Sequence, residues 1–233
     1  MNEIKEAIEK NDIQTLIKYK KKLLSMLKSP NAEIRKLGWT GVRYIVETGN
    51  SVKLESNKGY LRSLLWHKLQ GIRDDAWRNL DIYKELLVEG IERTLTASSD
   101  RIKWPAWSNV LKLIDLNLVP RDYVIKVRNS FWRLLRSRYG TIRKKAWRLF
   151  VELVKSGIFS TKDKYRFFDF LKHSRPKVRL YAWSSVPKLL ELNFLTKDDI
   201  KNNLKYLQEM CEMKGSVGNR AKNILEVIKK LIE

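Results

Sequence analysis

Clustered cations are the side chains of this sequence with the clearest chemical potential. Five of them occur within ten residues, around an expected helix start: Arg136, Arg138, Arg143, Lys144 and Lys145. Exposed backbone amides give a helix start a partial positive charge, so each cation there costs about 0.3–1 kcal/mol at low salt unless an anion binds. The pattern therefore predicts a binding site for phosphate groups.

A second basic cluster begins 36 residues after the first, at Lys172, and surrounds the next expected helix start. Residues 121–179 contain 18 Lys and Arg against four Asp and Glu, whereas residues 61–120 contain nine against eight. An ion-pair network would alternate both signs, so this surplus favours a polyanionic partner over a merely solvated surface. The predicted nucleic-acid-binding residues are Lys126, Arg133, Arg136, Arg138, Arg143, Lys144, Lys145, Arg148, Lys172, Arg175, Lys177 and Arg179.

One Trp has a spacing that fits base stacking. Trp104 lies two positions after Ile102, about 200° around an expected helix and away from its apolar stripe. An exposed indole at this place would stack on an unpaired base. Packing on a neighbouring repeat, or on a partner, is the alternative.

The residues needed for acid–base, nucleophilic or metal chemistry are sparse. The chain has one Cys, Cys211, and two His, His67 and His173. One Cys excludes an internal disulfide, and these three residues are too few for a metal-ligand cluster. Neither a phosphate loop nor a catalytic constellation appears. We expect no catalytic residue, no metal and no cofactor.

The cations are positioned by a repeated six-residue segment, which reads Ile-Arg-Lys-Lys-Ala-Trp at 142–147. Its first residue, the small residue four later and apolar residues eight and eleven later share one arc of a helix, which predicts a buried stripe. The Trp flanks that stripe, where packing between repeats is expected. The segments are 30–40 residues apart, a period typical of stacked helical pairs. Related segments begin at Ile34, Ile72, Ile102 and Val178, with a divergent copy at Val217.

This pattern resembles the HEAT repeat family of α-solenoids, whose second helix opens with Val or Ile, then Arg, and Ala three positions after the Arg. The resemblance covers residues 20–233 approximately and implies an all-α, right-handed α-solenoid of about six helical pairs. The family often has an Asp in the turn before the Arg, where this chain has Ser, Pro, Arg or Gly. We therefore expect some guanidinium groups of the Arg row to be free for a partner.

We expect a single repeat domain over residues 1–233. No apolar run of about 20 residues occurs, and the first residues are charged, so neither a membrane span nor a signal peptide is expected. The sequence predicts a monomeric, cytoplasmic protein. The repeats are predicted at 13–49, 59–90, 91–118, 122–157, 161–193 and 197–233, with 1–12 as an N-terminal cap.

Three classes of function fit these patterns. The favoured class is a non-catalytic binder of DNA or structured RNA that contacts backbone phosphates through residues 121–179. The second is a protein-interaction scaffold that docks an acidic partner, a common use of such solenoids. The third follows from resemblance to the HEAT-like DNA glycosylases of alkylation repair, which carry a catalytic Asp one turn after a Trp. Here Ser108 follows Trp104 by four positions and Leu111 follows Trp107, so the carboxylate is missing at that place.

Overall fold

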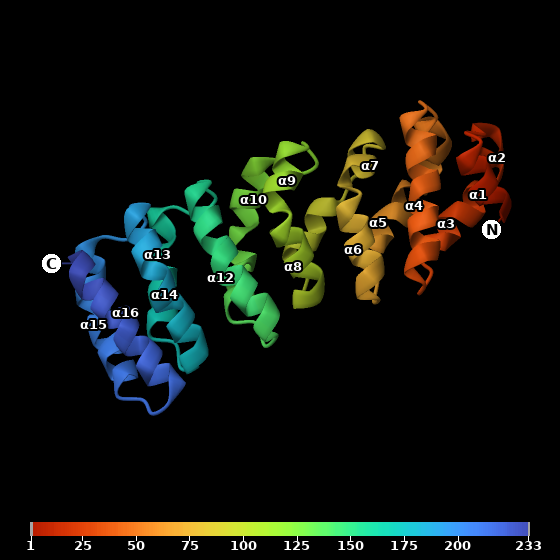
Figure 1. The fold of residues 1–233 in the computed structure, drawn as a ribbon. Helices are drawn as coiled ribbons and strands as arrows, with labels where there is room; N and C mark the ends of the chain where they lie inside the picture. Colours follow the sequence, from red (N-terminus) through yellow and green to blue (C-terminus); the bar gives the residue numbers. More distant parts are fainter. Residues whose placement is uncertain (1, 233) are drawn as a thin grey trace. The chain divides into compact units, whose positions relative to one another are not determined.

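The computed structural model describes residues 2–232, in which every regular element is a helix (Figure 1). The predicted all-α class is therefore confirmed. The chain divides into two compact units, with unit 1 ending at Val124 and unit 2 beginning at Ile125. The boundary falls inside helix α10 (Arg121–Val127). The prediction of one continuous domain stays a prediction.

Unit 1 is built from helices that pack in sequential pairs, such as α3 against α4. Figure 1 shows these pairs in red to green along the chain. The helices are α1 (Asn2–Glu9), α2 (Ile13–Lys18), α3 (Lys20–Met26), α4 (Ala32–Glu47), α5 (Lys58–Leu64), α6 (Gln70–Arg78), α7 (Leu80–Glu85), α8 (Asp100–Ser108) and α9 (Val110–Asp115), with the 3₁₀ helices η1 (Ser51–Asn57) and η2 (Ile91–Thr96).

Unit 2 repeats the same arrangement, and its second helices are continuous, as α4 is in unit 1. The first helices of its pairs lie beside the second ones, and α12 also packs on α14 and α14 on α16. The elements are η3 (Arg128–Ser130), α11 (Trp132–Leu135), α12 (Gly140–Lys155), η4 (Thr161–Asp163), α13 (Lys164–Leu171), α14 (Pro176–Glu191), α15 (Lys197–Cys211) and α16 (Ser216–Ile232).

The repeated segment begins the second helix of each pair, and its apolar positions form the core. In α12, Phe150 and Leu153, eight and eleven positions after Ile142, are fully buried. The core assignment of the Trp row is confirmed, because its members expose 5% or less of their surface. These Trp residues are Trp39, Trp77, Trp107, Trp147 and Trp183.

Three of these indoles also tie the two helices of a pair together. The indole N–H of Trp147 donates to the carbonyl of Leu135, twelve residues earlier, at 2.9 Å. The carbonyls at a helix end lack partners within the helix, so an indole donor satisfies one of them. Trp107 donates in the same way to Leu95, and Trp183 to Leu171, both at 3.0 Å.

Two Asn residues explain why the second helices of the second and third pairs are interrupted, whereas α4 of the first pair is continuous. Asn79 separates α6 from α7, and Asn109 separates α8 from α9. Each side-chain amide donates to the carbonyl four residues earlier, at 2.8 and 2.9 Å respectively. An Asn that bonds locally competes with the helical ladder. The equivalent position of α12 is Leu149, and α12 continues through it for 16 residues in all.

Candidate nucleic-acid interface

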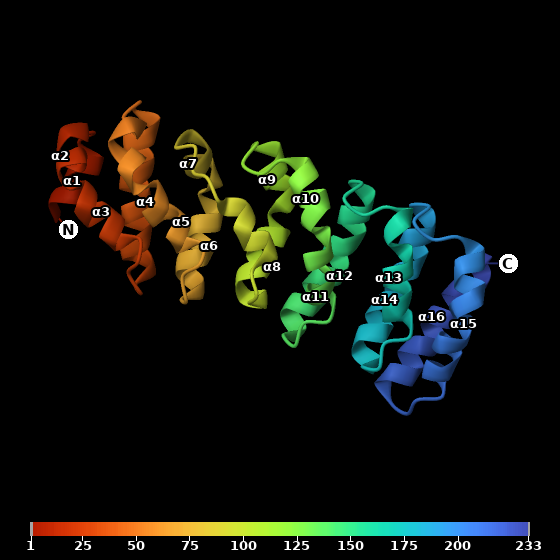
Figure 2. The same ribbon diagram turned by 180° about the vertical axis from the view of Figure 1, so that it is seen from behind.

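Two turns of unit 2 bring most of the predicted cations to one edge of that unit. The turn 136–139 joins α11 to α12, the turn 172–175 joins α13 to α14, and both lie at the lower edge in Figure 2. Helix α12 packs against α14, and a hydrogen bond from Arg175 to the carbonyl of Arg136 links the two turns, so the two helix starts are neighbours. We call this set of exposed cations the basic edge: Arg136, Arg138, Lys144, Lys145, Lys172, Arg175 and Lys177.

Neither helix start at the basic edge carries the side chains that normally compensate its charge. The N-cap residues are Tyr139 for α12 and Arg175 for α14; neither accepts a capping hydrogen bond, and neither first turn contains an acid. Helix α15 is the contrast, since Thr196 and Asp199 form a reciprocal capping box there. The partial positive charge of both helix starts therefore adds to that of the side chains, an arrangement that favours phosphate.

Hydrogen bonds orient two guanidinium groups of the basic edge without burying them. Arg138 lies over the ring of Tyr139, with its central carbon 4.9 Å from the centroid, and its Nη2 donates to the phenol oxygen at 2.7 Å. Nη2 of Arg175 donates to the backbone carbonyl of Arg136 and so links the two turns. Both side chains remain exposed to solvent.

The expectation that the Arg row is free for a partner is wrong for Arg143 and Arg179. Nη1 of Arg143 donates to the carbonyl of Ser137 at 2.7 Å. Arg179 is 8% exposed and donates to the carbonyl of Tyr206 at 2.5 Å and to Glu209 at 2.6 Å. Backbone carbonyls and the next repeat supply the acceptors that the missing Asp would have supplied. These two residues hold helices together and do not belong to the basic edge.

In unit 1, Arg35 and Arg73 use the same kind of acceptor. Nη1 of Arg35 donates to the carbonyls of Ser29 and Pro30, at 3.0 and 2.9 Å. Nη1 of Arg73 donates to the two carbonyls at the equivalent places of its own turn, at 2.6 and 3.0 Å. Arg35 and Arg73, like Arg143, therefore bind the turn that precedes their own helix, whereas Arg179 binds a later helix.

The remaining predicted cations are exposed but lie away from the two turns. Lys126 is on α10, Arg133 is on α11, and Arg148 is about two turns into α12. Their positions allow contacts that extend from the basic edge along the helices. They are not at the helix starts themselves.

Several acidic residues of unit 2 form ion pairs between consecutive repeats. Arg128 pairs with Asp163 at 2.9 Å, and Lys164 pairs with Asp199 at 3.0 Å, each over 35 residues of sequence. At the turns themselves, Lys172 pairs with Asp169 at 3.4 Å, an exposed pair that contributes little. These acids therefore neutralise cations near the first helices of the pairs and leave most cations of the basic edge without an ion pair among the described residues.

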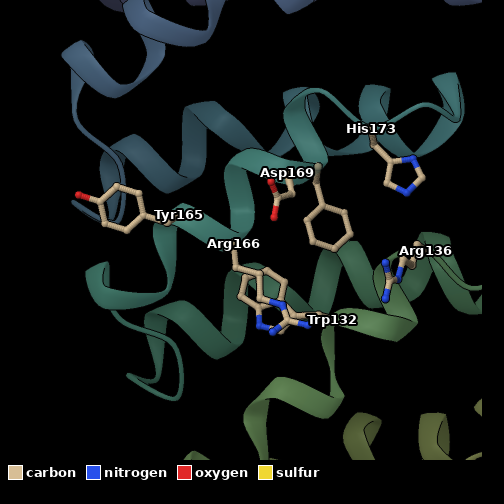
Figure 3. Close-up of a pocket in the computed structure, with 7 residues that line it drawn as sticks. Trp132, Arg136, Tyr165, Arg166, Asp169 and His173 are labelled. Carbon is tan, nitrogen blue, oxygen red and sulfur yellow. The ribbon is translucent and has the colours of Figure 1, made fainter.

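Beside the basic edge, α11, α13 and the following turn line an open pocket of about 420 Å³. Its floor is apolar, because Trp132 and Phe170 are 1% and 4% exposed. Charged and polar groups surround this floor (Figure 3). The lining residues are Trp132, Arg136, Tyr165, Arg166, Asp169, Phe170 and His173.

One exposed aromatic of unit 2, Tyr165, is a residue that the sequence patterns did not single out. Tyr165 is 71% exposed on α13, whereas Trp104, the predicted stacking residue in unit 1, is half-buried. Tyr165 lies two positions before the buried Phe167, about 200° away on the helix. That spacing is the signal that would have found it.

Within residues 2–232, His, Cys, Asp and Glu do not gather in a group of three that could hold a metal ion. None of the helices in this range is both long enough and apolar enough to cross a membrane.

The chain is similar over its full length to the archaeal HEAT-like repeats protein from Thermococcus onnurineus NA1. The two share 14% identity with a TM-score of 0.40, and the match covers 100% of this chain and 93% of that one. No protein-family model matches the sequence, and a search of curated proteins gave no match.

Proposed function

We propose that this protein is a non-catalytic nucleic-acid-binding protein that contacts backbone phosphates through the basic edge of unit 2. The observation that carries the proposal is the pair of neighbouring, uncapped helix starts of α12 and α14, which are surrounded by exposed Arg and Lys. Contacts of this kind are made to the backbone, so they position a nucleic acid without reading its sequence.

Charge and geometry both favour phosphate at this place. Residues 121–179 hold 18 of the 48 Lys and Arg of the chain and only four of its 26 Asp and Glu. The planar fork of Arg138 or Arg175 fits two phosphate oxygens, and the first amides of a helix donate to anions. An acidic protein surface would meet the same charges, and it is the alternative that the experiment must separate.

The test is a variant in which Arg138, Lys144, Lys145 and Arg175 are all changed to Glu. We expect it to lose binding to labelled duplex DNA and structured RNA, measured by fluorescence anisotropy at several salt concentrations. Single changes to Ala should weaken binding modestly and lower the salt slope by about one per lost contact.

A matched control separates local from bulk charge. Changing the exposed unit 1 residues Lys21, Lys36, Lys53 and Lys112 to Glu alters the net charge equally and should leave most binding intact. The basic-edge variant should fold as stably as wild type or better, since acids at a helix start favour its dipole. The proposal is refuted if the basic-edge variant still binds every nucleic acid tightly. If that variant loses binding only to an acidic protein, the scaffold function is favoured instead.

A further inference from the structure

The pocket between α11 and α13 adjoins the basic edge through Arg136, which belongs to both. The carbonyl of Arg136 accepts a hydrogen bond from Arg175, so the pocket and the second helix start share one connected turn. In Figure 3, Arg136 and His173 lie at one end of the pocket and Tyr165 lies at the other. A ligand bound at the basic edge could therefore extend into the pocket.

Three chemical requirements follow from the pocket lining. Arg136 and Arg166 call for an anionic group. Tyr165 is 71% exposed and offers a flat, accessible ring, which Phe168 supports from the side with 5.8 Å between ring centroids. The carboxylate of Asp169 accepts hydrogen bonds but cannot donate them, so it calls for a donor on the ligand.

His173 adds a fixed donor at the anionic end. Its Nδ1 accepts the backbone N–H of Arg175 at 3.0 Å. In a neutral imidazole the proton must then lie on Nε2, which can donate to a phosphate oxygen. The volume of about 420 Å³ is within the range of small-ligand sites.

We propose that this pocket holds one unpaired nucleotide of a single-stranded nucleic acid, with its phosphate near Arg136 and Arg166, its base against Tyr165 and a base donor on Asp169. This inference rests on the proposed function and adds a preference for strands with unpaired bases. A duplex keeps its bases stacked inside and offers the pocket phosphate alone. An acidic peptide offers carboxylates, which Asp169 repels.

The sharpest test is whether Asp169→Asn strengthens or weakens binding of a single strand. By charge alone, Asp169→Asn should strengthen binding of any polyanion, because it removes a negative charge and releases Lys172 from its ion pair. If Asp169 accepts a hydrogen bond from a base, the same change weakens binding, since the neutral amide oxygen of Asn is a weaker acceptor than a carboxylate. We expect about a fivefold to tenfold loss for a labelled 12-nucleotide single strand and no loss for the corresponding duplex.

Two matched variants complete the experiment. Glu152→Gln removes one exposed acid from α12, outside the pocket, and should leave single-strand binding unchanged or slightly tighter. Tyr165→Ser should weaken single-strand binding about tenfold, whereas Tyr165→Phe keeps the ring and the affinity. All of these positions are exposed, and thermal melting checks that each variant folds.

The outcomes separate the two proposals. If Asp169→Asn binds single strands as tightly as Glu152→Gln does, or if Tyr165→Ser affects single strand and duplex equally, the pocket does not hold a nucleotide while the basic edge still binds phosphate. If the wild-type protein binds no nucleic acid, both proposals are wrong. Displacement of the single strand from the pocket by poly-glutamate at equal charge would also overturn the nucleotide assignment.

Discussion

Leu87, just after the end of α7, has a left-handed backbone conformation that is unfavourable for its side chain. It follows the C-cap residue Leu86 of α7 with φ of +50°, and its side chain is 73% exposed. The equivalent residues after α9, α12 and α14 are Asn117, Gly157 and Asn193, and all three have positive φ. Leu in this region costs about 1–2 kcal/mol, and Gly and Asn avoid most of that cost.

Replacing Leu87 should therefore stabilise the protein. We expect Leu87→Asn and Leu87→Gly to raise the free energy of unfolding by about 1 kcal/mol, because the strain is relieved and little apolar burial is lost. The reverse change, Asn117→Leu, should lower it by a similar amount. Urea unfolding of the three variants measures both effects. A destabilised Leu87→Asn would mean that the exposed side chain has a contact which outweighs the strain.

At the scale of elements, the turn between the helices of a pair uses one side-chain acceptor at a fixed place. Nδ1 of His67 accepts the N–H of Leu69 at 3.1 Å, as Nδ1 of His173 does for the residue two positions later. In other pairs the same place is taken by a Ser, whose Oγ accepts the equivalent N–H, as in Ser29 and Ser137. A protonated imidazole cannot accept, so these two turns need neutral His.

The turns with His should make stability depend on pH. Burial lowers the pKa of His67 and of His173 below the ordinary 6.5, with neighbouring cations adding to the effect. Because the pKa is lowered in the folded state, the contribution of neutral His to the free energy of unfolding is fully present above pH 6.5. It is lost as the pH falls through the pKa of the folded state. We expect the melting temperature to fall as the pH is lowered from 7.5 to 5.

The double variant His67→Ser and His173→Ser checks this origin, because Ser occupies the same place in two other turns and does not titrate. It should show a smaller fall in melting temperature over the same pH range. An identical fall in both proteins would assign the pH dependence to other groups.

At the scale of the whole molecule, the formal net charge of +22 opposes folding through self-repulsion. The bridges between repeats are partly buried, as for Arg128 with Asp163 at 24% and 9% exposure, so salt screens them less than it screens the exposed cations. We therefore expect the melting temperature to rise between 20 and 300 mM NaCl.

The variant with Arg138, Lys144, Lys145 and Arg175 changed to Glu tests this expected salt dependence of the melting temperature. Four changes from cation to Glu lower the net charge by eight, from +22 to +14. Its melting temperature should depend less on salt than that of the wild type. A wild-type melting temperature that falls with salt would show that attractive ion pairs outweigh the repulsion.

The sequence by itself determined the helical pairs, the buried stripe and the Trp row. These features depend on local rules: the 3.6-residue period places Phe150 and Leu153 on one face, and Asn or Gly permits the left-handed ends at Asn117 and Gly157. The excess of cations in residues 121–179 was equally visible. Such properties need no knowledge of which distant residues meet.

Only the tertiary structure decided which cations are available to a partner. Arg143 and Lys144 are neighbours in sequence, yet Arg143 clamps the carbonyl of Ser137 while Lys144 is exposed. Arg179 is held by Tyr206 and Glu209 from a later helix, at a separation that no periodicity predicts. The pocket has the same origin, since it forms only where α11 and α13 pack together. Hydrogen-bond acceptors and cavities are properties of that packing, so the spacing of residues along the chain could not define them.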